Sequence, residues 1–100
     1  MSMLNFEWDK NKDRINRVKH GVSFEEASTV FYDSRAIVFD DPEHSAAEER
    51  FLILGVSRKM HVCIVSHCYR EKDEIIRIIS ARKATKREIE AYNGQGEILK

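Results

Sequence analysis

The sequence predicts an α+β domain in which two N-terminal helices pack on an antiparallel β-sheet meander and a short helix closes the chain. Three observations favour this class. The 100 residues fit one domain. Three apolar runs in the second half are separated by short polar links of hairpin length. Two capping signatures, Ser23 with Glu26 and Thr85 with Glu88, mark the starts of helices.

The beginning of the chain predicts one strand and one helix. Apolar and polar residues alternate over residues 4–8, as they do in a strand. Asp9 is suited to cap a helix, and Gly21 is suited to end it in the left-handed conformation. Ile15 and Val18 are expected to form the narrow apolar stripe of this helix.

The rest of the chain predicts a second helix, four further strands and a last helix. The second helix begins after Ser23, and the last helix begins after Thr85. The strands are expected at residues 36–39, 50–57, 61–69 and 74–81. The order is therefore β-α-α-β-β-β-β-α, with one domain over residues 1–93 and a frayed tail over residues 94–100.

Charge and cysteine content exclude several classes of protein. The chain carries 17 basic and 17 acidic residues, yet basic residues gather in its second half, most densely from Arg77 to Arg87. No basic leader precedes an apolar stretch, and no apolar run reaches the length of a membrane span, so a cytoplasmic location is expected. Cys63 and Cys68 are five apart in one strand, should point to opposite faces and are expected to stay unpaired.

The basic segment holds the two residues that we expect to contact phosphate. Arg77 lies between isoleucines in a strand, where it is either half of an ion pair, with Glu49 or Asp41, or a phosphate ligand. Arg82 lies where this strand meets the last helix and can reach a polyanion. In a regular strand the two arginines point to opposite faces, so one site holds both only if the strand twists or bulges near Ser80.

Candidates for proton transfer are weaker. Glu49 and His67 are the main candidates for acid–base catalysis, with His44 behind them. His67 is also expected as a hydrogen-bonded core residue, and Glu49 as half of a surface ion pair. Histidine and cysteine spacing completes no metal site, and no nucleotide-binding or zinc-protease motif occurs, so neither metal nor cofactor is expected.

Further basic residues are expected to hold the phosphate backbone of a nucleic acid. They are Lys83, Lys86 and Arg87, and contacts of this kind make binding dependent on salt. Tyr92 either anchors the last helix or stacks on a base.

Several blocks of the sequence resemble the BrnT family of type II toxins. In order, they are FEWD at 6–9, KHGVSFEEA at 19–27, VF at 30–31, DPEHS at 41–45, EERF at 48–51 and RIISARKAT at 77–85, followed by Glu88 and Tyr92. The resemblance covers about residues 4 to 93. The turn at residues 70–73 lacks the glycine expected there.

The resemblance implies a RelE-like ribonuclease toxin that cleaves RNA without a metal and inhibits translation. It also implies a BrnA-type antitoxin with a ribbon-helix-helix domain, a dimer of toxin–antitoxin heterodimers, and operator DNA contacted through the antitoxin. The alternative from the residues alone is a non-catalytic module whose basic C-terminal end docks an acidic partner.

Overall fold

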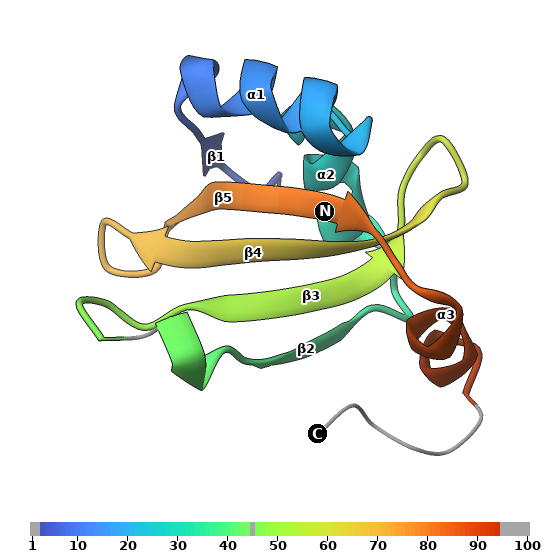
Figure 1. Cartoon of the computed structure of the whole chain (residues 1–100). Helices are drawn as coiled ribbons and strands as arrows, with labels where there is room; N and C mark the ends of the chain where they lie inside the picture. The colour runs from blue at the N-terminus through green and yellow to red at the C-terminus, as the bar shows by residue number, and fades with distance from the viewer. Residues whose placement is uncertain (1–2, 45, 95–100) are drawn as a thin grey trace.

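Five strands form one mixed sheet in the order β1-β5-β4-β3-β2, and helices α1 and α2 cover one of its faces (Figure 1). The computed structural model describes residues 3–44 and 46–94, so most of the predicted tail lies outside the described residues. The elements are β1 (Phe6–Glu7), α1 (Lys10–His20), α2 (Phe24–Thr29), the 3-10 turn η1 (Val30–Tyr32), β2 (Ile37–Asp40), the 3-10 turn η2 (Pro42–His44), β3 (Phe51–Val56), β4 (Val62–Arg70), β5 (Ile75–Lys83) and α3 (Lys86–Tyr92).

The predicted element order is confirmed, but the prediction of a fully antiparallel sheet is wrong for β1. Strands β2 to β5 form the antiparallel meander, while β1 runs parallel to β5, with Phe6 opposite Ile76 and Glu7 opposite Arg77. Short hairpins force consecutive strands to alternate in direction. The chain leaves β1 through two helices before it returns to the sheet, and this long connection imposes no such constraint.

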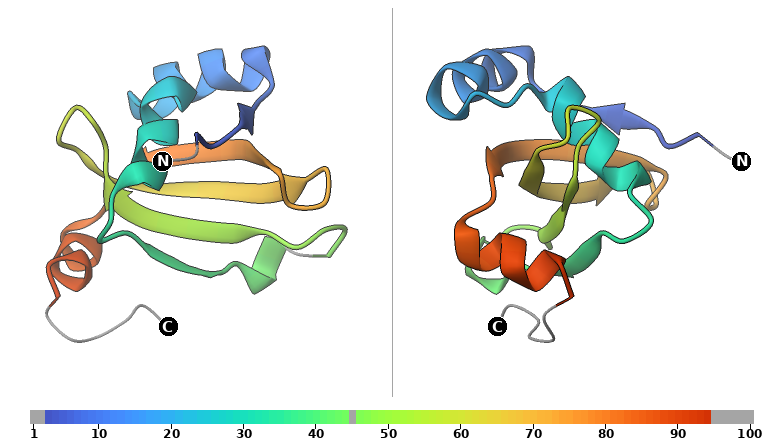
Figure 2. Two further views of the ribbon diagram at one scale, coloured as in Figure 1. Left: turned by 180° about the vertical axis from the view of Figure 1, so that it is seen from behind. Right: turned by 90° about the vertical axis from the view of Figure 1, so that its right-hand side faces the viewer.

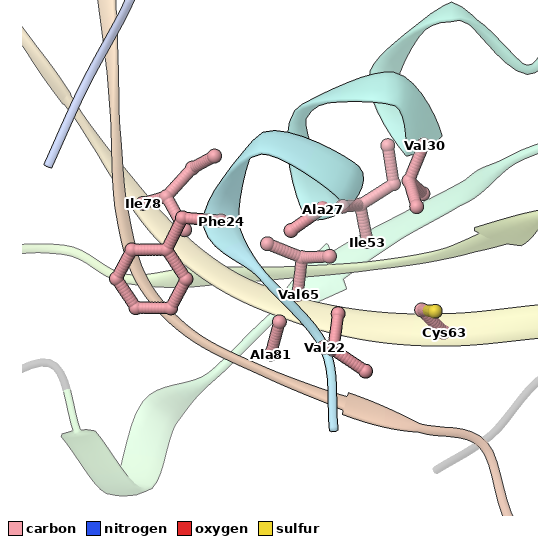
Figure 3. Close-up of a cluster of buried hydrophobic side chains, with 9 residues drawn as sticks. All are labelled: Val22, Phe24, Ala27, Val30, Ile53, Cys63, Val65, Ile78 and Ala81. Atoms are coloured by element: carbon pink, nitrogen blue, oxygen red, sulfur yellow. The ribbon is translucent and has the colours of Figure 1, made fainter. Parts of the chain in front are cut away.

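The core lies between α2 and the covered face of the sheet (Figure 3). Phe24 and Ala27 from α2 meet Val65 from β4 and Ile78 from β5, and all four side chains are buried. Because strand residues alternate in direction, Leu52, Ile64 and Ser66 point to the other face of the sheet. This second face, which we call the open face, carries the groove described below.

Helix α1 contacts the sheet through a polar residue, and the expectation of an apolar stripe on it is wrong. Ile15 and Val18 are exposed, whereas Asn16 is buried beside β5. The amide of Asn16 donates to the carbonyls of Val22 and Ala81 at 2.8 and 2.9 Å, and its oxygen accepts from the Ala81 N–H at 3.1 Å. Asn16 therefore makes the hydrogen bonds to Ala81 that a neighbouring strand would otherwise make. It does so at a part of the β5 edge that β1, which pairs only with Ile76 and Arg77, does not cover.

Only half of the first capping signature acts as a cap. The Ser23 hydroxyl accepts from the Glu26 N–H at 2.9 Å, but the Glu26 carboxylate turns away from the helix terminus. It accepts instead from the Ser57 hydroxyl at 2.6 Å and from Nδ1 of His61 at 2.8 Å. Glu26 is buried, and it joins α2 to the hairpin between β3 and β4.

This buried carboxylate predicts a loss of stability in acid. Burial by itself raises the pKa of Glu26, but hydrogen bonds from Ser57 and His61 outweigh it and hold the pKa below the usual 4.5. The folded state then binds fewer protons than the unfolded state, so the contribution of Glu26 is present above pH 4.5 and is lost as the pH falls through the lowered value.

Urea unfolding at several pH values measures this effect. The free energy of unfolding of Glu26→Gln is expected to depend less on pH than that of the wild type below pH 4.5. Glu25→Gln is the matched control, because the Glu25 side chain is exposed on the same helix, and it should keep the wild-type dependence. Equal acid dependence in Glu26→Gln and the wild type would contradict the assignment.

The second capping signature is complete and fixes α3 at the end of the sheet (Figure 2). The Thr85 hydroxyl accepts from the Glu88 N–H, and the Glu88 carboxylate accepts from the Thr85 N–H. At the other end of α3, the Tyr92 hydroxyl donates to Asp33 at 2.6 Å. The start and the end of the helix are therefore both held by side-chain hydrogen bonds.

Candidate functional site

A bulge in β5 brings both predicted arginines to the open face. Ser66 pairs with Ser80, but the next residue of β4, His67, pairs with Ile78, so Ile79 is an extra residue in β5. As a result Ile78 and Ala81, three positions apart, both point into the core. Arg77 precedes Ile78 and Arg82 follows Ala81, so each points away from the core. The bulge that the sequence required near Ser80 is therefore present.

The open face carries a groove of about 380 Å³ over the middle of the sheet. Its floor includes Ser66 from β4 and Ser80 from β5. Its basic and histidine side chains are Arg82 at the end of β5, Arg50 before β3, His20 at the end of α1 and His44 in η2, and its acidic ones are Asp41 and Glu43. Arginine and histidine side chains from four separate segments therefore line one space.

Arg82 is held in place by the last helix. Its Nη1 and Nη2 atoms donate to the two carboxylate oxygens of Glu88 at 2.8 and 2.9 Å, and Nη1 also donates to the Lys83 carbonyl. Hydrogen bonding between the two groups raises the pKa of Arg82 and lowers that of Glu88. A guanidinium has a second edge, formed by Nε and one Nη. Glu88 therefore orients the Arg82 guanidinium at the end of the groove.

Arg77 reaches the open face but does not line the groove. Its Nη1 donates to Glu7 of β1 at 2.7 Å, and both side chains are partly exposed. An ion pair was one of the two roles that the sequence allowed, with Glu49 or Asp41 as partner. The partner is instead Glu7, because the parallel strand β1 places it directly beside Arg77.

His67 lies in the covered face of the sheet, not in the groove. Its side chain is fully buried, and its Nδ1 donates to the Val65 carbonyl at 3.2 Å. The rings of Phe31 and Tyr69 pack edge-on against it at 4.7 and 5.4 Å. This burial lowers the pKa of His67 and so favours the neutral ring. The position agrees with the core role rather than the catalytic one, and we do not place His67 in the site.

Glu49 lies in a different cavity from Arg82. This second cavity has a volume of about 430 Å³ and is lined by Glu48, Glu49, Phe51, Tyr69 and Asp73. Three carboxylates around two aromatic rings disfavour a phosphate. The structure thus separates Glu49 from the groove that contains the arginine of β5.

The predicted RNA-binding residues surround α3 rather than the groove. Lys83, Lys86 and Arg87 are exposed beside its first turn. Tyr92 anchors the helix through Asp33, and the Arg35 guanidinium lies 5.8 Å from its ring centroid. The three cations extend the positive charge around Arg82, whereas Tyr92 matches the anchoring role.

Three groove residues were not predicted as main site residues. His20 is the last residue of α1, where the sequence predicts only a helix-terminal cation, and Arg50 is the first residue of a predicted strand. His44 was ranked behind Glu49 and His67. Only tertiary structure brings these residues together, although each lies inside a block that carries the family resemblance. Within residues 3–44 and 46–94, no group of three His, Cys, Asp or Glu side chains has metal-binding geometry.

In the part of the chain that the structure describes, no helix is both long and apolar enough to cross a membrane.

Comparisons with known proteins found a matching family model and similar solved structures. The family model described as "Ribonuclease toxin, BrnT, of type II toxin-antitoxin system" matches residues 8–88. Among solved structures, the chain is similar to the 1.1 Å crystal structure of the Brucella abortus ribonuclease toxin BrnT, at 23% identity and a TM-score of 0.65. The match covers 84% of this chain and 100% of the Brucella chain. No curated protein matches. The chain belongs to the BrnT family of ribonuclease toxins of type II toxin–antitoxin systems.

Proposed function

We propose that the chain is an endoribonuclease that cleaves RNA in the groove of the open face without a metal ion. The observation that carries the proposal is the β5 bulge, which directs Arg82 into the groove and Arg77 to the same side of the sheet. Arg50 supplies another cation to the same space. Asp41 and Glu43 balance the formal charge of the two arginines in the groove, so what favours phosphate is the guanidinium group itself, whose paired N–H donors match phosphate oxygens.

The proposed reaction is an internal transesterification. The ribose 2′-oxygen attacks the adjacent phosphorus, and the bond from phosphorus to the 5′-oxygen breaks. The products are a 2′,3′-cyclic phosphate and a free 5′-hydroxyl. Negative charge builds on the phosphoryl oxygens, so preorganised donors aimed at them lower the barrier. We assign this role to the second edge of Arg82, with Arg50 beside it and Arg77 at a greater distance.

The rest of the proposal concerns partners. We propose that RNA cleavage inhibits translation and that a BrnA-type antitoxin with a ribbon-helix-helix domain neutralises it in a dimer of heterodimers. Operator DNA is then contacted through the antitoxin. Lys83, Lys86 and Arg87 support the binding of the RNA backbone, because they are exposed cations that follow Arg82 in the chain and lie beside the first turn of α3. The same three residues also suit the alternative function, a non-catalytic module that docks an acidic partner.

An RNA cleavage assay in EDTA separates the two functions. The purified chain is incubated with a 5′-labelled RNA, and the product ends are analysed. We expect cleavage to continue in EDTA and to leave cyclic phosphate and 5′-hydroxyl ends. If the RNA stays intact in the presence of the folded chain, with or without added Mg²⁺, the ribonuclease function is excluded and the non-catalytic docking module is favoured. Cleavage that requires added metal would contradict the proposed chemistry but retain the substrate.

A further inference from the structure

A histidine on one border of the groove has a carboxylate partner. In η2, Nδ1 of His44 lies 3.0 and 3.1 Å from the two carboxylate oxygens of Asp41. The Asp41 side chain is 13% exposed, whereas that of His44 is 60% exposed. The backbone holds this turn, because the His44 N–H donates to the Asp41 carbonyl and the Asp41 N–H donates to the Arg50 carbonyl. With Nδ1 bound to Asp41, Nε2 is the nitrogen that His44 can offer to a substrate.

A second histidine lines the groove from the opposite border. His20 is the last residue of α1, and α1 packs along β5, the strand farthest from β2 and η2 among those under the groove. Gly21 adopts φ 72° and ends the helix with a hydrogen bond from its N–H to the Arg17 carbonyl. This turn fixes His20 beside Ala81 and Arg82, which line the same cavity.

The floor between the two histidines is formed by three neighbouring strands. It includes Ser80 from β5, Ser66 from β4 and Leu52 from β3, and these three strands are neighbours. Neighbouring strands lie about 4.8 Å apart, so the floor is roughly 10 Å wide. Imidazoles that extend inward from both borders would flank a phosphate bound between them. In-line displacement requires such an arrangement, because the attacking and leaving oxygens lie on opposite sides of phosphorus.

We propose that His44 and His20 are the catalytic base and acid of the RNA cleavage assigned to the groove. The inference rests on the proposed function and adds the groups that move protons. Asp41 is a positioning residue that holds Nδ1 of His44 and stabilises the imidazolium formed when His44 accepts a proton. His20 takes the role of the acid because it lies on the border of the groove opposite His44.

The proton steps balance without a cofactor. Nε2 of His44 takes the proton from the ribose 2′-hydroxyl as the bond from the 2′-oxygen to phosphorus forms. The bond from phosphorus to the 5′-oxygen breaks, and the protonated ring of His20 gives its proton to that oxygen. The chain is left with His44 protonated and His20 neutral, and exchange with water restores both. Arg82 stays charged throughout and stabilises the phosphoryl oxygens.

The test compares two substrates that differ in the leaving atom. One is an RNA oligonucleotide with a single cleavable phosphodiester, and the other has sulfur in place of its bridging 5′-oxygen. A thiolate leaves without protonation, so the sulfur substrate does not need the acid. On the oxygen substrate, His44→Ala and His20→Ala should each lower the cleavage rate by about 10²–10⁴-fold. On the sulfur substrate, His20→Ala should regain nearly the wild-type rate, while His44→Ala should remain slow.

Controls separate catalysis from folding. Lys19→Ala changes the exposed neighbour of His20 and should keep the wild-type rate on both substrates. Asp41→Asn should lower the rate on both substrates, as His44→Ala does, but by less. The circular dichroism spectra and thermal unfolding of all variants are compared with the wild type.

The possible outcomes distinguish this inference from the proposed function. If the wild type cleaves RNA and both histidine variants cleave it as fast as the wild type does, the inference is overturned and the proposed function stands. Rescue of His44→Ala by sulfur, or no rescue of a folded His20→Ala, would overturn the assignment of base and acid. A wild type that cleaves neither substrate would overturn the proposed function itself.

Discussion

Replacing Arg82 with alanine is expected to lower the rate of RNA cleavage by about 10²–10³-fold, the cost of one lost donor at a developing oxyanion. The change removes the guanidinium that Glu88 orients at the end of the groove. Arg82→Lys keeps the charge but loses the planar fork, so it should recover only part of the rate. Single-turnover cleavage in EDTA, at saturating protein, measures the effect on the chemical step.

This loss should occur in a folded protein. The Arg82 side chain is 42% exposed, and an ion pair at such a position contributes only about 0–1 kcal/mol to stability. Arg58→Ala removes an exposed arginine in the turn between β3 and β4 that does not line the groove, and serves as the control. If Arg82→Ala cleaved as fast as Arg58→Ala, Arg82 would have no role in the reaction.

Replacing Asn16 with alanine should give the largest loss of stability among the polar changes that we consider. The side chain makes three hydrogen bonds, and two of them pair its amide with the N–H and the carbonyl of Ala81. Truncation removes all three and leaves buried backbone groups without a partner, at a cost of about 3 kcal/mol. Urea unfolding should show this as a lower midpoint with an unchanged slope.

A matched substitution on the same helix tests the specificity of this effect. Asn11→Ala removes an exposed asparagine from α1 and should change the free energy of unfolding by less than about 0.5 kcal/mol. Asn16→Asp keeps an oxygen acceptor for the Ala81 N–H but loses the donor to its carbonyl, so its stability should also fall. Equal stability of Asn16→Ala and Asn11→Ala would refute the role of Asn16 as a substitute strand partner.

Local signals in the sequence predicted the order of the elements, while contacts between distant segments decided the rest. Strand alternation, short polar links and helix caps depend on neighbouring residues, and they placed β2 to β5 and the three helices correctly. The direction of β1 depends on a long connection through two helices, which no local pattern records. The exposure of Ile15 and Val18 has a similar cause. The face of α1 that meets β5 carries Asn16, which hydrogen-bonds the backbone of Ala81, so the two apolar side chains lie outside this contact.

In the candidate site, too, local sequence patterns predicted some residues, and contacts between distant segments decided the others. Arg82 was predicted from its position where a strand meets a capped helix, and it does line the groove. Glu49 and His67 were chosen from position along the chain, but the first lies in another cavity and the second is buried. His20 belongs to a helix that is far from the groove in sequence. No pattern of residue spacing in the sequence indicates that the end of α1 and the turn η2 line the same groove.

The bulge at Ile79 has a consequence for how β5 can change over time. Removing Ile79 alone would make the pairing of β5 with β4 regular and would leave Arg77 and Arg82 four positions apart, so both would still point away from the core. A strand that kept this residue but lost the bulge would instead turn one of the two arginines toward the core. At Ile79, β5 can therefore lose one residue without exchanging its two faces.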